Sequence, residues 1–153
     1  IIRNTLAIGF SPVTIKQIKT KTLPAQNYFL YSLYLLFLTG LGSILISLQS
    51  KNIMSFFGQD YLPAQEILSI LIFTVPIIFA TVPFTLFLQS TGNEFVILLS
   101  VFIPLILKIP LLFYLYSDYG VLGVVYSTLI YNIMSMFILC VFTYAILFKE
   151  KKE

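Results

Sequence analysis

The chain has 153 residues, of which 59% are hydrophobic and 10% charged, and its formal net charge at pH 7 is +3. A soluble globular protein carries about 25% charged residues, so a chain this apolar has too few polar groups for a water-exposed surface, and the composition indicates an integral membrane protein. The small, unevenly placed positive charge argues against nucleic-acid binding, and a chain with no histidine and one cysteine, Cys140, offers no ordinary metal cluster and no Cys–His pair.

Residues 1–27 come first and carry several basic side chains. The chain opens Ile-Ile-Arg-Asn, without a methionine and without the pattern of a signal peptide, so we expect it to belong to a longer protein. Within 1–27 we expect the end of a preceding helix, followed by a basic cytoplasmic connector.

Charged residues divide the rest of the chain into long uncharged intervals. A bilayer core of about 30 Å needs about 20 helical residues, and four intervals are long enough, one of them interrupted by a single lysine. The sequence therefore predicts an all-α integral membrane fold. We expect a four-helix transmembrane bundle over 28–148, with spans at about 28–48, 67–89, 95–116 and 120–147, and a cytoplasmic tail at 149–153.

Basic residues predict the orientation of these spans, because cytoplasmic loops near membrane helices are rich in Lys and Arg. Lys51 falls on one side of the predicted membrane, and the following residues fall on the other side: Arg3, Lys16, Lys19, Lys21, Lys149, Lys151 and Lys152. Four spans bring both ends of the chain to the same side. We therefore expect a multi-pass protein of the cytoplasmic (plasma) membrane, in contact with its lipids, with both ends in the cytoplasm.

Prolines interrupt the second and third predicted spans. Pro76 and Pro83 lie in the second, and Pro104 and Pro110 in the third. A proline has no N–H and clashes with the preceding turn, so these helices are expected to bend or to open locally. Two interpretations remain open, since such bends either shape the packing of the helices or let them flex during a transport cycle.

Small and polar residues recur in the first and last predicted spans. In the last span, Gly123 and Ser127 are four residues apart, a spacing that lets another helix approach closely, and Gly120 lies in the turn before it. In the first span, a similar stripe of small residues is expected to serve packing: Gly40, Ser43 and Ser47. Further along the last span, Ser127 is followed by more polar residues: Thr128, Asn132 and Ser135. These residues either link helices by hydrogen bonds or line a watery cavity.

Lys108 is the only charged residue between Glu94 and Asp118. At about 1.5 Å per helical residue it lies some 20 Å from the cytoplasmic end of its span and about 13–15 Å from the outer end. Its long stem could carry the amine to the outer interface. A charge facing lipid costs about 2.5–3.5 kcal/mol or more, whereas one facing a water-filled cavity costs far less and can attract an anion. We therefore interpret Lys108 as a cavity-lining cation, with Asn132, Thr128 and Ser127 as weaker candidates.

Three stretches around the predicted spans resemble one family of exporters: FGQDYLPA at 57–64, LQSTGN at 88–93 and YGVLGVVYSTLI at 119–130. Together they are similar to the C-terminal part of polysaccharide flippases (Wzx-like O-antigen or teichoic-type unit exporters) and of their peptidoglycan-precursor relatives. All belong with the multidrug/oligosaccharidyl-lipid/polysaccharide exporters. The order and spacing of the stretches carry the resemblance, which covers about 56–132.

The resemblance implies two lobes of six helices around a central cavity, of which this chain would supply the last four helices. It implies that Lys108 lines the cavity, near a position where relatives place an asparagine or lysine, and that the substrate is a glycan on a polyprenyl pyrophosphate, an anion. It implies no cofactor, and the partners would be the substrate and the remaining N-terminal helices. The sequence departs from the family pattern at Leu112, where an asparagine is frequent, and at Pro110.

We therefore interpret the chain as part of a non-enzymatic flippase that moves a lipid-linked oligosaccharide or cell-wall precursor across the membrane by alternating access. Two alternatives stay open. A drug/cation antiporter of the same fold should carry intramembrane acids, and none occurs within the four predicted spans. A small four-helix scaffold or subunit would have no transport role.

Overall fold

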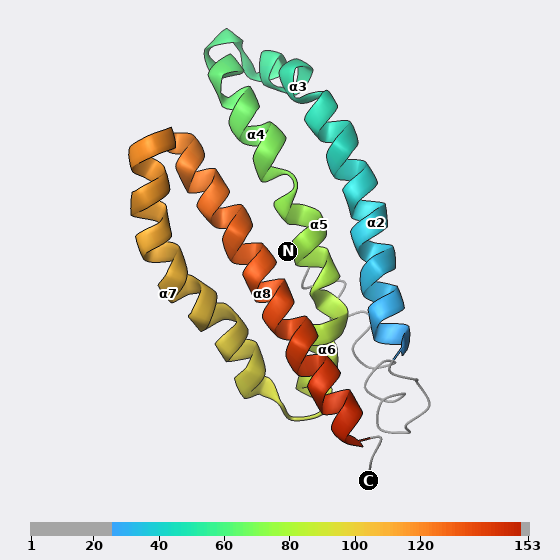
Figure 1. Ribbon diagram of the computed structural model, residues 1–153. Helices are drawn as coiled ribbons and strands as arrows, with labels where there is room; N and C mark the ends of the chain where they lie inside the picture. The colour runs from blue at the N-terminus through green and yellow to red at the C-terminus, as the bar shows by residue number, and fades with distance from the viewer. Residues whose placement is uncertain (1–25, 151–153) are drawn as a thin grey trace.

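The computed structural model describes the backbone of residues 26–150 and the side chains of residues 28–147, so most of the expected basic connector and of the expected tail lies outside the described residues. The described chain is helical nearly throughout, and its elements follow one another with short turns between them (Figure 1). In chain order they are α2 (Gln26–Leu48), α3 (Ser50–Phe57), the 3-10 helix η1 (Gln59–Ala64), α4 (Gln65–Leu71), α5 (Thr74–Ala80), α6 (Val82–Ser90), α7 (Glu94–Tyr119) and α8 (Val121–Glu150).

Four stretches of the described residues are long and apolar enough to cross a membrane: Tyr28–Leu48, Gln59–Ser90, Glu94–Tyr119 and Val121–Leu147. Many of their large apolar side chains are exposed on the surface of the bundle. Helices that are apolar all round are typical of membrane spans, where acyl chains cover the outer face. The expected all-α membrane fold is confirmed.

The four spans pack side by side in an order that differs from their order in the chain (Figure 1). The segment α4–α6 packs against α2 on one side and against α8 on the other, and α7 packs mainly on α8. The spatial order is therefore first, second, fourth and third span. As a consequence α7, which carries Lys108, lies at one edge of the described bundle and has α8 as its main neighbour.

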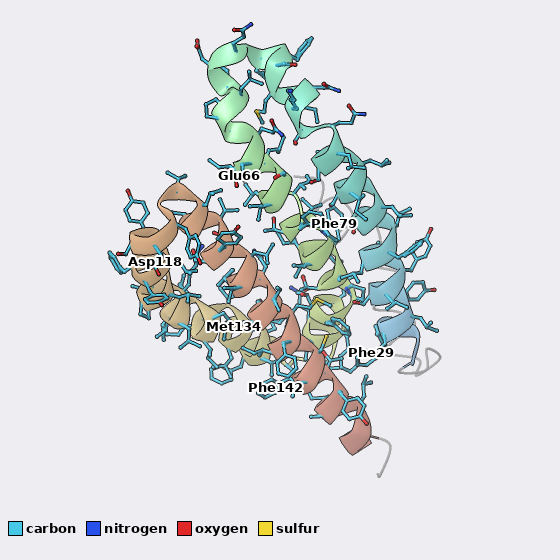
Figure 2. The ribbon with its side chains drawn as sticks, turned by 45° about the horizontal axis from the view of Figure 1, so that its top comes forward. Phe29, Glu66, Phe79, Asp118, Met134 and Phe142 are labelled. Atoms are coloured by element: carbon cyan, nitrogen blue, oxygen red, sulfur yellow. The ribbon has the colours of Figure 1, made fainter. Side chains whose placement is uncertain are left out.

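Both ends of the described bundle lie on the same side of it. A cluster of buried side chains joins the start of α2, the end of α6 and the last part of α8: Tyr28, Phe84, Phe87, Leu88 and Leu139. The rings of Tyr28 and Phe87 lie 5.1 Å apart, centroid to centroid. Figure 2 shows Phe29 and Phe142 toward this end of the bundle, and Glu66 and Asp118 toward the opposite end. The placement of this side in the cytoplasm stays a prediction.

The second span is interrupted twice, whereas the third is continuous. Residues 72–73 separate α4 from α5, and Thr81 separates α5 from α6. Each interruption comes shortly before a proline, Pro76 or Pro83, that has no N–H for the preceding turn. In contrast, α7 runs as one helix through Pro104 and Pro110. A proline alone therefore does not decide where this chain breaks a helix.

Serine hydroxyls on α2 bond to backbone carbonyls along the interrupted span. The hydroxyl of Ser32 donates to the carbonyl of Ala80, the last residue of α5, at 2.7 Å. The hydroxyl of Ser43 lies 3.1 Å from the carbonyl of Ile72, the acceptor that Pro76 cannot reach with an N–H. One turn further along α2, the hydroxyl of Ser47 lies 3.2 Å from the carbonyl of Ser69. The carbonyl of Ile72 also accepts from the N–H of Val75, so Ser43 adds to a bond already made there. A carbonyl freed inside a membrane needs a partner, and Ser32 and Ser47 offer one from α2 near the two breaks.

The serine contacts also hold the first span onto the second. Ser32 and Ser43 are both buried, as expected for side chains at a helix contact. Ser43 lies within hydrogen-bonding distance of its own Thr39 carbonyl as well, and its single proton serves one acceptor at a time. Gly40, expected in the same packing stripe, has open space where a Cβ would stand. The contact is therefore made by hydroxyls rather than by glycine.

The α7–α8 hairpin depends on two glycines. Gly120 adopts φ +57 between the two helices, a conformation that suits glycine. A Cβ on Gly123 would lie 2.7 Å from the backbone nitrogen of Tyr116 and nearer still to the carbonyl of Leu115. The absence of a side chain at Gly123 therefore lets the first turn of α8 pass close to the last turns of α7.

We expect Ser32→Ala to destabilise the chain, because the carbonyl of Ala80 loses its donor from α2. Interhelical hydrogen bonds in membranes contribute about 0.6 kcal/mol on average and up to about 1.7 kcal/mol. Reversible unfolding in mixed micelles measures the loss. The matched control is Ser55→Ala, which removes an exposed hydroxyl that bonds within its own helix. Equal unfolding free energies for the two variants would contradict the role of Ser32.

We expect Gly123→Ala to destabilise the chain more than Gly40→Ala. A methyl group at Gly123 meets the backbone of α7, which cannot give way like a flexible side chain, whereas at Gly40 it meets open space. Overpacking of this kind costs about 1–3 kcal/mol. The same unfolding measurement compares the two variants. If both substitutions have the same effect, the close approach at Gly123 is not a determinant of the hairpin.

Candidate functional site

Lys108 lies on the face of α7 that packs against α8. Ser100 and Pro104 are buried and Lys108 is partly buried, at positions four residues apart that share one helical face. The neighbouring residues Leu107 and Ile109 are exposed. Helical periodicity therefore turns the lysine toward the adjacent helix rather than toward the outer face of α7.

The amine of Lys108 is held by two side chains of α8. Its Nζ donates to Thr128 Oγ1 at 3.1 Å and lies 5.3 Å from the centroid of the Tyr131 ring. The hydroxyl of Thr128 donates its own proton to the carbonyl of Val124, at 2.9 Å, so its oxygen is free to accept. A cation over an aromatic face is stabilised by about 0.5–1 kcal/mol when exposed and by about 2 kcal/mol when desolvated.

These contacts leave the charge of Lys108 without a counter-charge among the described spans. An ammonium group has three N–H donors, of which Thr128 takes one and the π face of Tyr131 offers a weaker partner. No Asp or Glu occurs within 28–48, 67–89, 95–116 or 120–147. The positive charge and the remaining N–H capacity are therefore suited to binding an anion.

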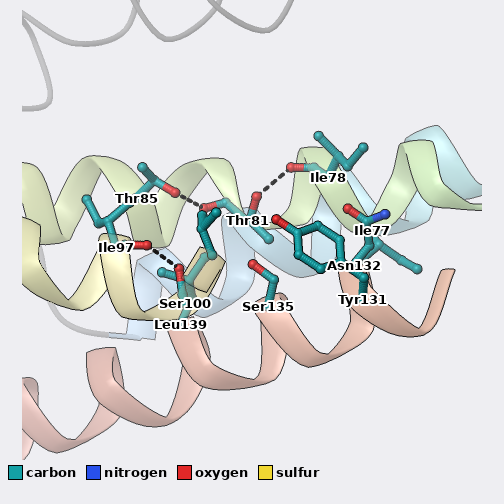
Figure 3. A pocket seen from close by; sticks show the side chains of 11 residues that line it. Ile77, Ile78, Thr81, Thr85, Ile97, Ser100, Tyr131, Asn132, Ser135 and Leu139 are labelled. Carbon is teal, nitrogen blue, oxygen red and sulfur yellow. Dashed lines mark hydrogen bonds between the residues drawn. The ribbon is translucent and has the colours of Figure 1, made fainter. Parts of the chain in front are cut away.

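A pocket of about 160 Å³ lies beside the contacts that Lys108 makes with Thr128 and Tyr131. It is lined by residues of α5, α6, the first half of α7, and α8. Tyr131 both lines the pocket and contacts Lys108. Figure 3 shows polar side chains reaching it from both sides. Its polar lining consists of Thr81, Thr85, Ser100, Tyr131, Asn132 and Ser135.

Most of these polar groups present oxygen acceptors to the pocket. The hydroxyls of Thr81, Thr85 and Ser100 each donate to a carbonyl of their own helical segment, at 2.7–3.0 Å (Figure 3). The Asn132 Nδ2 donates to the carbonyl of Thr128 at 2.8 Å. The three hydroxyl oxygens and the Asn132 Oδ1 remain as acceptors, while the Asn132 amide keeps its second N–H as a donor. The pocket is therefore suited to groups that both donate and accept hydrogen bonds, such as water or a hydroxyl.

The structure separates the four candidate residues that the sequence grouped together. Asn132 lines the pocket, and Thr128 holds Lys108. Lys108 itself is not part of the pocket lining. Ser127 has no exposed surface and donates to the carbonyl of Val124 at 2.8 Å, which makes it a packing residue of α8.

Sequence reasoning missed the residue that joins the two parts of the site, Tyr131. Its signal was its position, three residues after Thr128 and therefore on the same side of α8. It also missed the pocket hydroxyls of α5 and α6. The spacing of Thr74, Thr81 and Thr85, at seven and four residues, marked one face of the second span.

A multi-span helical bundle with a cation held between two helices and a polar pocket beside it is typical of membrane transport proteins. Comparison with known families matches residues 19–114 to the MatE family. The match covers well over half of the chain, which therefore belongs to the MatE family, whose members are membrane transporters rather than enzymes. No curated protein and no solved structure matches the chain.

We expect a cysteine at position 108 to react with a membrane-impermeant thiol reagent. In a Cys140→Ser background, Lys108→Cys would be labelled because its face is turned into the polar interior, whereas Ile109→Cys would face lipid and stay unlabelled. Mass spectrometry of vesicle-reconstituted protein measures the labelled fraction. Protection of both cysteines would contradict a hydrated environment for Lys108.

Proposed function

We propose that the chain is part of a flippase that moves a lipid-linked oligosaccharide or cell-wall precursor across the cytoplasmic membrane. The observation that carries the proposal is the lone ammonium of Lys108, directed at α8, with no acid in 28–48, 67–89, 95–116 or 120–147 to pair with it. The head group of such a lipid carries phosphates, which bind an ammonium by charge-assisted hydrogen bonds. Membership of the MatE family supports export as the general activity.

In the proposed cycle, Lys108 neutralises the anionic part of the substrate while it lies within the membrane. Thr128 and Tyr131 hold the amine on one side, so the N–H groups they leave free point to where the phosphate would bind. Two lobes then rock about the site and open it to the other side. The expected partners are the glycan-bearing lipid and the remaining helices of the same protein, and both ends of the chain are expected in the cytoplasm.

The interrupted second span is suited to the moving part of this cycle. Its segments α5 and α6 contribute to the polar pocket. The span contacts α2 through the hydroxyl of Ser32 at the end of α5 and through that of Ser43 at Ile72, between α4 and α5. Contacts of this kind are individually weak, at about 0.6 kcal/mol. A change of partner at one or two of them would let a segment tilt without unfolding.

The family assignment is also compatible with a drug/cation antiporter. A transporter of cationic drugs needs an acid to bind the drug or the coupling ion. Residues 28–48, 67–89, 95–116 and 120–147 carry one cation and no acid, and the acids of the spans lie at or near their ends, which favours an anionic substrate for this part of the protein. A scaffold without transport activity does not account for membership of an exporter family.

We expect Lys108→Gln to impair glycan export and Lys108→Arg to retain part of it. A hydrogen bond to a charged group contributes about 1.5–3 kcal/mol, so losing it should lower transport about tenfold or more. Appearance of the glycan on the outer surface of cells that depend on the full-length protein measures the effect. Lys51→Gln, at an exposed lysine outside the core of the spans, is the control and should export normally. Equal export by Lys108→Gln and the wild type would end the proposal.

A further inference from the structure

The segment between the first two membrane-crossing helices carries an apolar surface that the transport site does not use. In α3, the polar residues Lys51, Asn52 and Ser55 fall on one side of the helix, since each residue advances about 100° around the axis. The apolar residues fall on the other side: Ile53, Met54, Phe56 and Phe57. α3 is therefore strongly amphipathic, unlike the spans on either side of it.

Three aromatic rings gather at the end of α3 and the start of η1. Phe56, Phe57 and Tyr61 are 88%, 65% and 57% exposed, respectively. Neighbouring rings still touch one another, with centroids 6.0 Å apart for Phe56–Phe57 and 6.5 Å apart for Phe57–Tyr61. Phe56 and Phe57 lie outside the four membrane-crossing stretches, and Tyr61 lies at the very start of the second, so the three rings belong to the connection between α2 and α4.

The position of this connection points to the membrane surface. The apolar run of α2 from Tyr28 to Leu48 has 21 residues, which at about 1.5 Å per residue equals the bilayer core of about 30 Å. Since α3 starts at Ser50, it begins where the hydrocarbon core ends. Figure 1 shows α3 turning away from the line of α2 at this end of the bundle.

The chemistry of the connection fits the same location. Aromatic residues are enriched where hydrocarbon meets head groups, and amphipathic helices lie in that plane with their apolar side buried. Lys51, exposed on the polar side, has a stem long enough to reach the lipid phosphates. Asp60 and Glu66 lie at or near the ends of η1, where water is available. Along the chain, the exposed apolar residues of α2 are followed by the exposed Phe56 and Phe57 of α3.

We propose that α3 and the start of η1 form an interfacial anchor, with Phe56, Phe57 and Tyr61 inserted into the head-group region of the bilayer. The partner is the lipid surface itself. The anchor fixes the end of α2 at a set depth in the membrane. It thereby holds α2 in position for the contacts that its serines make with the interrupted second span.

A single tryptophan tests the anchor, because the chain contains none. Phe57→Trp, with Phe56→Trp as a second variant, keeps an aromatic ring at the site. The full chain is reconstituted into phosphatidylcholine vesicles, with and without lipid brominated near the carbonyl end of one acyl chain. An aqueous quencher is supplied on both sides of the membrane in a separate measurement. Ser55→Trp places the same probe on the polar side of α3 as the matched control.

For Phe57→Trp we expect blue-shifted emission and quenching by brominated lipid that is several-fold stronger than for Ser55→Trp. We expect the aqueous quencher to show the opposite order. Emission typical of water, with strong aqueous quenching, would overturn the proposal. Blue-shifted emission that neither quencher affects would overturn it as well, because the rings would then be covered by protein. Agreement of Phe56→Trp with Phe57→Trp guards against a local effect of one substitution.

Discussion

The requirement that every backbone carbonyl inside a membrane has a hydrogen-bond donor governs the arrangement of this bundle. The second span breaks twice, and a break inside hydrocarbon is tolerated only where a neighbour supplies the missing donors. Ser32 supplies one from α2 to the carbonyl of Ala80, whereas the carbonyl of Ile72, near Ser43, already accepts from the N–H of Val75. The first span is therefore placed against the second by polar contacts, and its outer face is left to lipid. The order of the remaining helices follows, since α8 takes the other side of the broken span and α7 packs on α8.

Much of the fold follows from the sequence, because long uncharged intervals have one stable solution in a bilayer. The spans and their all-helical character could be predicted from charge placement alone. The positions of the breaks follow from the sequence only in part. Pro76 and Pro83 each follow a Thr-Val pair and accompany interruptions, whereas α7 passes through Pro104 and Pro110, which have no threonine before them. At each break the threonine hydroxyl donates to a carbonyl three residues earlier, and α2 adds further donors that only tertiary packing brings near.

In the candidate site, too, the sequence indicates the key residue and tertiary packing determines its partners. Lys108 stands out in the sequence because a charge in so apolar a run requires a reason. Its partners could not be read from spacing, since Thr128 and Tyr131 lie on a different helix. Their position depends on how closely α8 approaches α7, and therefore on Gly123, where a side chain would meet the α7 backbone. The pocket residues come from three spans, so a pattern within one span could not predict that they lie together.

The two parts of the site offer complementary chemistry to one kind of ligand. Lys108 supplies positive charge and N–H donors, while the adjoining pocket supplies uncharged groups, mainly oxygen acceptors together with the second N–H of Asn132. A simple anion would use only the first part, and a neutral sugar only the second. A phosphate joined to a hydroxyl-bearing group would use both, with Tyr131 between them. Under the proposed function, this pairing favours a glycan phosphate over an inorganic anion, because each part of the site would be left partly unsatisfied by the simpler ligand.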